Sequence, residues 1–186
     1  MSNTIRLSGI AYESLVNGPG IRRVFFSQGC KHNCIGCFNP DTHDFNGGEE
    51  RDIEELIKDL ADNPFIDGVT FSGGDPLEQA NKFIYIAKAA RELGLNIWSY
   101  TGYKFEYLLE HANEFNKWKE YLENIDVLVD GKFDINKKED GLWATRQAIE
   151  ETYAIPTAFK AYKEFVFDWM DKNEKLDWRN KTITTL

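Results

Sequence analysis

The sequence predicts an α/β protein of a single domain, in which helices cover a parallel sheet. Short apolar segments typical of buried strands alternate with segments whose apolar residues follow helical spacing. Hydrophobic residues make up 42% of the 186 positions, and neither an internal repeat nor a Pro- or Ser-rich linker divides the chain. Alternating strands and helices are typical of βαβ units, whose right-handed crossovers make the strands parallel. Functional loops of such folds lie at the carboxyl ends of the strands.

Four segments are predicted to be buried strands because they are short and rich in β-branched or aromatic residues. They are residues 24–26, 69–71, 97–100 and 127–129. Three further segments carry apolar residues at the spacing of a helix face. They are residues 53–60, which stop before Asn63-Pro64, residues 83–90, which Gly94 follows as a C-cap, and residues 105–115.

These strands and helices all fall in residues 1–140, which we predict to form the domain. Residues 141–186 are predicted to be a C-terminal extension packed on the same domain. The extension is rich in aromatic and charged residues, and its pattern fits a helix as well as a strand, so its structure stays open.

The charge balance is acidic, with 22 Lys and Arg against 31 Asp and Glu and a net charge of -9. Such a surface repels a polyanion on average, so we expect no nucleic-acid partner. No apolar run approaches the roughly 18 residues of a membrane span, and the first residues lack the apolar core of a signal peptide. We therefore expect a cytoplasmic protein with no membrane partner. A chain of this length buries about 70% of its unfolded surface, so it needs no metal merely to fold.

The three cysteines, Cys30, Cys34 and Cys37, lie within eight residues after the first of the predicted strands. Their odd number and their C-x3-C-x2-C spacing indicate metal ligands or a redox centre rather than a disulfide framework. Thiolates are preferred ligands of iron-sulfur clusters and of zinc. Three cysteines can hold three irons of a [4Fe-4S] cluster and leave the fourth iron open, which is typical of a reactive site.

Two simpler interpretations of the cysteines stay open. In the first, His32 completes a structural zinc site with the three thiols, although its place between two ligands only four residues apart strains simultaneous coordination. In the second, the cysteines are unliganded residues of the core.

A glycine-rich turn, defined here as residues 72–78, follows the second predicted strand. Asp75 suits the N-cap of a helix, Pro76 suits its first position, and Glu78 stands where a capping-box residue reaches back to the cap. Helix capping leaves Gly73 and Gly74 unexplained. Two glycines at the end of a strand suit the close approach of a ligand to the backbone, so the pair indicates either a turn or a ligand site.

The cysteine spacing and this turn together resemble the radical S-adenosylmethionine superfamily. In that family the C-x3-C-x2-C loop holds a [4Fe-4S] cluster whose open iron chelates the amino and carboxylate groups of S-adenosylmethionine. Reduction of the cluster cleaves the sulfonium and yields methionine and a 5′-deoxyadenosyl radical, so the cofactor carries the chemistry and the protein orients it. The resemblance implies that Cys30, Cys34 and Cys37 bind the cluster.

The same resemblance implies roles for other residues. Gly73, Gly74 and Asp75 are similar to the family's G-G-E-P motif, with Asp75 in the acidic place, and would hold the methionine end of S-adenosylmethionine. Gly36 and Phe38 would flank the adenine by backbone and ring contacts.

Three further segments resemble a narrower group, the activating proteins of anaerobic (class III) ribonucleoside-triphosphate reductases. They are residues 17–20, 98–103 and 130–133, in the order and spacing of that group. This resemblance implies that Asp130 and Lys132 contact the nucleoside or the carboxylate of S-adenosylmethionine. After Lys132 the chain departs from the group's pattern.

The resemblance implies an activating enzyme that installs a glycyl radical on an anaerobic ribonucleoside-triphosphate reductase and takes electrons from a donor such as flavodoxin or ferredoxin. It also implies a partial, open β/α barrel, since the chain is too short to close eight strands, and the lateral opening suits a protein loop as substrate. No side chain needs to act as an acid or a base. Two alternatives remain: a superfamily enzyme that acts on a small molecule, such as a deazaguanine synthase, and a non-catalytic zinc or iron-sulfur binding module.

Overall fold

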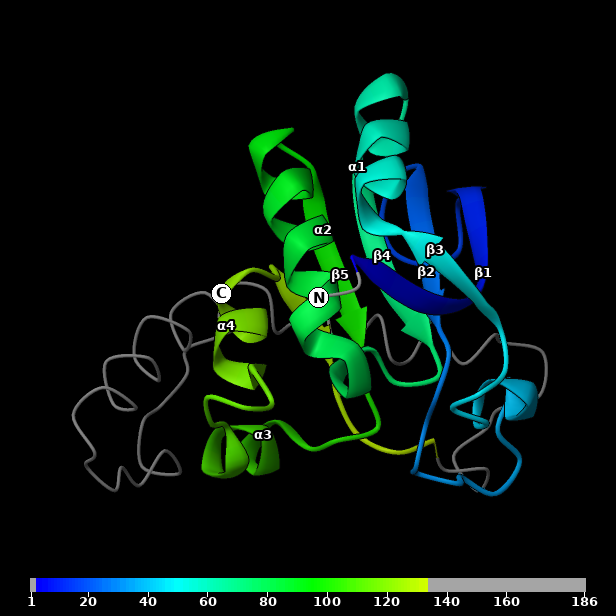
Figure 1. Ribbon diagram of the computed structural model, residues 1–186, viewed down its shortest axis with the longest axis vertical. Helices are drawn as coiled ribbons and strands as arrows, with labels where there is room; N and C mark the ends of the chain where they lie inside the picture. Colours follow the sequence, from blue (N-terminus) through cyan, green and yellow to red (C-terminus); the bar gives the residue numbers. More distant parts are fainter. Residues whose placement is uncertain (1–2, 134–186) are drawn as a thin grey trace.

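The computed structural model describes residues 3–133, in which helices accompany one mixed sheet (Figure 1). Two of its elements, η1 and η2, are short 3-10 helices. In chain order the elements are β1 (Thr4–Ser14), β2 (Arg22–Ser27), η1 (Pro40–Thr42), β3 (Glu49–Asp52), α1 (Ile53–Asp62), β4 (Gly68–Gly73), η2 (Pro76–Gln79), α2 (Ala80–Glu92), β5 (Asn96–Tyr100), α3 (Phe105–His111), α4 (Trp118–Glu123) and β6 (Val127–Val129). The predicted extension, residues 141–186, and the predicted domain end at residue 140 lie outside the described residues.

The strands of the described chain form a six-stranded sheet in the order β3-β1-β2-β4-β5-β6. The four strands predicted from the sequence are β2, β4, β5 and β6, and each pairs in parallel with its neighbour among them, as predicted. The prediction of a wholly parallel sheet is wrong on one side, because β1 pairs antiparallel with both β2 and β3.

The antiparallel strands β1 and β3 were not predicted, because the prediction relied on short apolar segments. Strands of antiparallel sheets commonly face water on one side, so their hydrophobic residues are few. In β1 only Ile5 and Leu7 belong to the buried hydrophobic core, and the pairing of this strand with β2 is interrupted by register shifts. The sequence of β3 is Glu-Glu-Arg-Asp, and its pairing with β1 holds this charged strand in the sheet.

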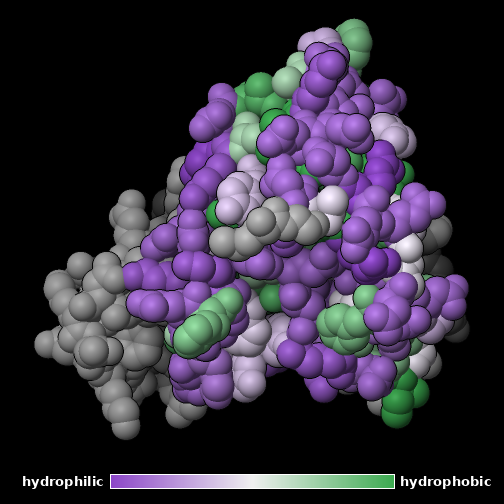
Figure 2. Space-filling view, in the orientation of Figure 1, coloured by the Kyte–Doolittle hydropathy of each residue, from purple (hydrophilic) through white to green (hydrophobic). Residues whose placement is uncertain are grey.

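The hydrophobic core lies between the sheet and its helices. Phe25 and Phe71 are register partners on β2 and β4, and the ring of Phe71 packs on Phe83 of α2 with centroids 4.7 Å apart. Val24 and Thr70, which alternate with this pair, are also completely buried, so the inner strands are covered on both faces. Figure 1 shows α1 and α2 side by side across one face of the sheet, and in Figure 2 the outer surface on that side is mostly hydrophilic.

The first two predicted helices are confirmed. The N-cap of α1 is Asp52, whose Oδ1 accepts hydrogen bonds from the N–H groups of Glu54 and Glu55. Two residues after α2 ends, Gly94 adopts a positive φ of 75°, the left-handed conformation predicted for its C-cap. No helix within residues 3–133 combines the length and the apolar character needed to span a membrane.

The third predicted helix is wrong in its second half. α3 ends at His111, because the side-chain oxygen of Asn113 accepts hydrogen bonds from the N–H groups of Phe115 and Asn116 and forms a local turn. Phe115, predicted on the buried face, is 96% exposed. The chain then forms α4, which the sequence did not predict as a separate helix.

Candidate functional site

The cysteine loop, defined here as residues 28–48, leaves the carboxyl end of β2 and returns to β3. Its base is closed by a hydrogen bond of 2.8 Å from the Gly29 N–H to the Thr42 carbonyl. The amide of Gln28, a buried residue, donates a further bond of 2.6 Å to the carbonyl of Asp44. The loop is therefore anchored to the end of β2 by several of its own backbone groups.

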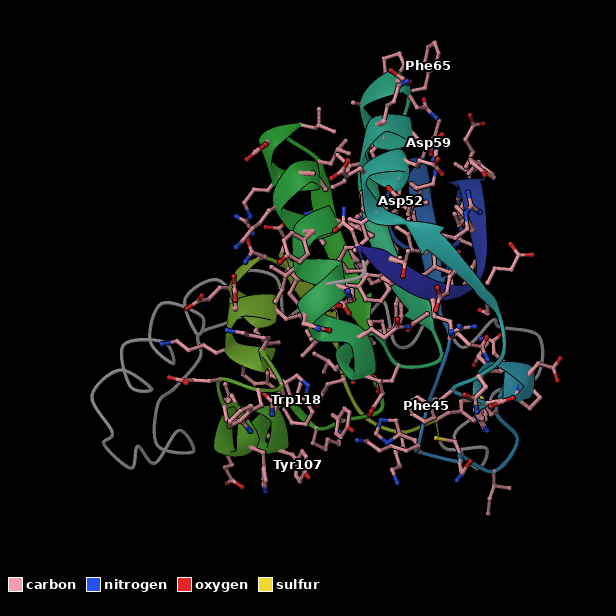
Figure 3. The ribbon with its side chains drawn as sticks, viewed as in Figure 1. Phe45, Asp52, Asp59, Phe65, Tyr107 and Trp118 are labelled. Carbon is pink, nitrogen blue, oxygen red and sulfur yellow. The ribbon has the colours of Figure 1, made fainter. Side chains whose placement is uncertain are left out.

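The three thiols of the cysteine loop are free and of intermediate exposure. Burial raises the pKa of the Cys30 thiol, and the charges of Asp75, Cys34 and Cys37 add to this increase. Figure 3 shows sulfur atoms at the end of the molecule where Phe45 lies, beyond the carboxyl ends of the parallel strands. Across the described part of the chain, no three His, Cys, Asp or Glu side chains lie close enough together to hold a metal ion. The donor set itself, three thiols on one short loop, fits iron-sulfur chemistry.

The glycine-rich turn packs directly on the base of the cysteine loop. The N–H of Gly74 donates to the carbonyl of Ser27 (2.8 Å), and the N–H of Asp75 donates to the carbonyl of Gly29 (2.9 Å). A Cβ at position 74 would lie 2.5 Å from the Gly29 carbonyl oxygen, and one at position 73 would lie 2.7 Å from the Ser27 nitrogen. Gly73 also has a φ of 93°. The close approach of protein backbone is therefore enough to explain both glycines.

Asp75 is the centre of a buried hydrogen-bond network. As predicted, it caps the following helix, a 3-10 helix, by accepting from the N–H of Leu77 (3.0 Å). Its carboxylate also accepts from Thr101 Oγ1 (2.9 Å), Gly102 N–H (3.0 Å) and His32 Nε2 (2.7 Å). With no exposed surface, this carboxylate joins the cysteine loop, the turn and the segment after β5.

The capping-box role predicted for Glu78 is wrong. Its side chain accepts a hydrogen bond from the Tyr103 hydroxyl and forms an ion pair of 2.9 Å with Lys31 of the cysteine loop. Burial, and then the hydrogen bond to Glu78, raise the pKa of the Tyr103 hydroxyl far above its usual range. Glu78 therefore makes a second connection between the turn and the cysteine loop.

The remaining candidate residues lie in the cysteine loop or directly after β6. Gly36 has a φ of 74°, and the exposed ring of Phe38 contacts Phe133 edge to face at a centroid distance of 4.7 Å. Asp130 directly follows β6, and its Oδ2 accepts from the N–H of Phe105 at the start of α3 (2.9 Å). Lys132 is exposed. These contacts explain Asp130 as a helix-capping residue without any ligand.

Three partners of Asp75, namely His32, Thr101 and Gly102, are functional candidates that sequence reasoning missed. Thr101 and Gly102 belong to a segment that resembles the activating proteins, but the sequence offers no signal that they bond to Asp75. His32 was considered only as a zinc ligand. In the structure its Nε2 binds Asp75, so this nitrogen does not face the thiols.

A family model for a 4Fe-4S single-cluster domain matches residues 16–149. The match covers more than half of the chain and includes the cysteine loop, the glycine-rich turn and β6. The chain therefore belongs to this family of 4Fe-4S single-cluster proteins, and the predicted cluster is confirmed at the level of the family.

The chain is similar to several anaerobic ribonucleoside-triphosphate reductase-activating proteins and to a pyruvate formate-lyase-activating enzyme. The protein of Enterobacteria phage T4 is 38% identical over 136 residues, which cover 69% of this chain and 81% of that protein. The protein of Escherichia coli is 36% identical over 137 residues, covering 69% and 84%. The pyruvate formate-lyase-activating enzyme of Clostridium pasteurianum is 43% identical over 117 residues, covering 58% and 49%. Among solved structures, QueE from Escherichia coli aligns with 93% of this chain and 92% of its own at a TM-score of 0.45 and 10% identity, a likeness too low to carry an argument.

Proposed function

We propose that this chain is a radical S-adenosylmethionine enzyme that installs a glycyl radical on an anaerobic ribonucleoside-triphosphate reductase. The observation that carries the proposal is a three-cysteine loop packed on a glycine-rich turn at one edge of the sheet, in a chain 38% identical to an activating protein of such a reductase. When bound, the reduced [4Fe-4S] cluster supplies the electron that cleaves S-adenosylmethionine into methionine and a 5′-deoxyadenosyl radical. Transfer of a hydrogen atom from a glycine of the partner to that radical would give 5′-deoxyadenosine and the glycyl radical.

Cys30, Cys34 and Cys37 are the proposed cluster ligands. Three thiols on one loop leave one iron of a cube without a protein ligand, as the binding of S-adenosylmethionine requires. The anchored base of the cysteine loop supports this assignment, because the bond from Gly29 to Thr42 fixes the segment just before the first ligand. The Cys37 N–H donates to the Cys34 carbonyl (3.2 Å), so a backbone turn joins the second and third proposed ligands.

The proposed S-adenosylmethionine site is the adjoining turn. Gly73 and Gly74 would offer backbone groups to the methionine end, while Asp75 shapes the turn from inside, since its carboxylate is enclosed by protein donors. Gly36 and Phe38 would flank the adenine. Both lie on the cysteine loop and are exposed, so they are accessible to a ligand.

Asp130 and Lys132 are proposed to contact the nucleoside or the carboxylate of S-adenosylmethionine. They follow β6, whose carboxyl end lies at the same sheet edge as those of β2 and β4, because these strands belong to one parallel set. Asp130 retains partial exposure beside its bond to the Phe105 N–H, which leaves a carboxylate oxygen available to a hydroxyl group.

An open partial barrel is proposed for the whole domain, and its lateral opening would admit the glycine-bearing loop of the partner. Exposed apolar side chains around the cysteines support this mode of access. Ile35 is 81% exposed, Phe38 57% and Phe45 48%. A low-potential electron donor such as flavodoxin or ferredoxin, a cytoplasmic location and the lack of a nucleic-acid partner remain predictions from the sequence.

The proposal is tested with anaerobically purified, iron-loaded protein. Dithionite and S-adenosylmethionine should yield methionine and 5′-deoxyadenosine, and addition of an anaerobic ribonucleoside-triphosphate reductase should yield a glycyl radical visible by electron paramagnetic resonance. Cleavage without a glycyl radical would favour a small-molecule substrate. A protein that loads zinc in preference to iron, or that binds a cluster without cleaving S-adenosylmethionine, would contradict the proposal.

The identity of the partner can be tested in the same assay. Because one relative is a pyruvate formate-lyase-activating enzyme, that lyase should be offered in parallel with the reductase. We expect the radical on the reductase. A glycyl radical that forms only on the lyase would support the proposed activating activity but would show that the lyase, not the reductase, is the partner.

A further inference from the structure

The segment between the first two cysteines is tied by its side chains to the glycine-rich turn. His32 Nε2 lies 2.7 Å from Asp75 Oδ2. This nitrogen is the donor, because an ionised carboxylate can only accept. The two side chains are 7% and 0% exposed, so the bond is shielded from water, where hydrogen bonds to charged groups are strongest.

The environment of His32 holds its ring in one place. The ring of Tyr103 contacts it edge to face at a centroid distance of 4.4 Å. On another side, a Cβ at position 102 would lie 2.4 Å from His32 Cδ2, so the imidazole occupies the space that Gly102 leaves free. The neighbouring ion pair of Lys31 with Glu78 (2.9 Å) ties the same segment to the same turn.

Asp75 does not need His32 to satisfy its carboxylate. The Leu77 N–H donates to Oδ1 and the Gly102 N–H donates to Oδ2, and the single Thr101 hydroxyl hydrogen lies within reach of either oxygen, so both oxygens already have partners. The histidine bond therefore mainly fixes the position of the cysteine loop, in which His32 lies between two of the proposed ligands.

We propose that His32 is a positioning residue, which sets the cysteine loop at a defined distance from the turn that receives S-adenosylmethionine. This inference rests on the proposed function. Cys30 and Cys34 flank His32, whereas Asp75 belongs to the turn, so one short bond spans the two parts of the site. Groups that orient a metal site from outside its ligand set typically matter for binding by one to two orders of magnitude.

The test measures S-adenosylmethionine binding to the iron-loaded protein in the oxidised state without reductant, so that no turnover occurs. His32→Ala should keep the iron content of the wild type, because all three thiols remain. Its dissociation constant for S-adenosylmethionine should rise roughly tenfold or more. The spectral change of the cluster on addition of S-adenosylmethionine should weaken in parallel.

Two variants and one control define the cause. His32→Gln keeps an N–H donor within reach of Asp75 and should restore affinity to within about threefold of the wild type. Gly102→Ala leaves the histidine in the chain but drives its ring away, and should reproduce the loss even if His32→Ala does not fold. His111→Ala removes an exposed histidine that bonds the Tyr107 carbonyl and stacks on the Tyr107 ring within its own helix, and it should leave the affinity for S-adenosylmethionine unchanged.

The outcomes separate this inference from the proposed function. Wild-type affinity in both His32→Ala and Gly102→Ala would overturn the positioning role, as would loss of iron from His32→Ala, which would make His32 a group required for the cluster itself. Failure of the wild-type protein to bind or cleave S-adenosylmethionine would instead overturn the proposed function.

Discussion

At the carboxyl ends of the parallel strands, the contacts of individual residues indicate whether each has a structural or a ligand-binding role. Gly74 meets the backbone of Gly29, and Asp75 is enclosed by donors from three segments of the chain. The side chains of Cys34 and Cys37 keep partial exposure. At this scale the cysteines are free of partners that would exclude a cofactor, whereas the glycine-rich turn first supports their loop.

Replacement of a cysteine should remove the cluster and leave the fold intact. Cys34→Ser should retain less than about half of the wild-type iron after reconstitution, since a neutral hydroxyl is a poor substitute for a thiolate. The circular dichroism spectrum should not change, because a chain of this length buries enough surface to fold without metal. Ile35→Ala, at the exposed neighbouring position, is the control and should load iron fully. A full iron content in Cys34→Ser would refute the ligand assignment.

A side chain at position 74 should strain the base of the cysteine loop. In Gly74→Ala the new Cβ would stand 2.5 Å from a backbone oxygen that cannot easily move. We expect the unfolding free energy of the metal-free protein to fall by about 1–3 kcal/mol, as for other overpacked sites. Urea denaturation measures this change. Gly9→Ala, where a Cβ meets nothing within 4 Å, should be nearly neutral, and equal effects of the two changes would contradict the packing explanation.

Secondary-structure elements join through a few specific contacts. The start of α1 depends on its Asp52 cap, which is visible at the amino end of that helix in Figure 3. In the same view Tyr107 of α3 and Trp118 of α4 lie close together, with ring centroids 6.2 Å apart. α4 is in turn bonded to β5 through the Tyr121 hydroxyl and Ser99 Oγ (2.6 Å).

Removal of the α1 cap should destabilise the protein modestly. Asp52→Ala leaves the N–H groups of Glu54 and Glu55 without their acceptor and should cost about 1 kcal/mol in urea denaturation. Asp62→Ala, at the other end of the helix, removes a charge that opposes the helix dipole, so it should be neutral or slightly stabilising. If both variants lost the same stability, capping would not be the cause.

The burial of Tyr121 on α4 should make the stability of the protein decrease at alkaline pH. Burial raises the pKa of Tyr121 well above its usual range, so the folded protein keeps a proton that the unfolded chain releases above its pKa of roughly 10. Stability from this group is complete below that pH and falls as pH rises, with a slope of about 1 kcal/mol per pH unit. Tyr121→Phe should flatten this part of the profile, measured by urea denaturation between pH 9 and 11. An unchanged slope would contradict the assignment.

At the scale of the whole molecule, the described residues 3–133 form one sheet, and the proposed site lies at the carboxyl ends of its parallel strands. The family match ends at residue 149, and every motif that carries the proposed chemistry precedes residue 134. We therefore expect residues 153–186, which follow the family match, to be separable from the proposed cofactor chemistry.

Deletion of residues 153–186 should spare the cofactor chemistry and impair activation of the partner. The truncated protein should keep its iron and the reductive cleavage of S-adenosylmethionine, while the yield of glycyl radical should fall, because aromatic residues of the kind deleted are enriched at interfaces. The full-length protein in the same assay is the control. Full activation by a soluble truncated protein would rule out a docking role, whereas aggregation would indicate that these aromatic residues cover apolar surface.

The features that could be predicted from the amino-acid sequence are those that depend on local patterns. The spacing of Cys30, Cys34 and Cys37 predicted the cluster, the short apolar segments predicted four parallel strands, and Asp75 and Gly94 predicted where helices begin or end. Such patterns are readable because side-chain period, caps and ligand spacing depend on residues close together in the chain.

The contacts between segments that are far apart in the sequence became known from the folded structure. The charged strand β3 pairs with β1. The backbones of β2 and the cysteine loop leave no room for side chains at Gly73 and Gly74. His32 and Thr101, from distant segments, both bond to Asp75. No periodicity records these contacts, because each depends on which side chains meet when the strands pair. The cysteines can be recognised from their spacing, but the histidine that holds their loop is visible only once the chain is folded.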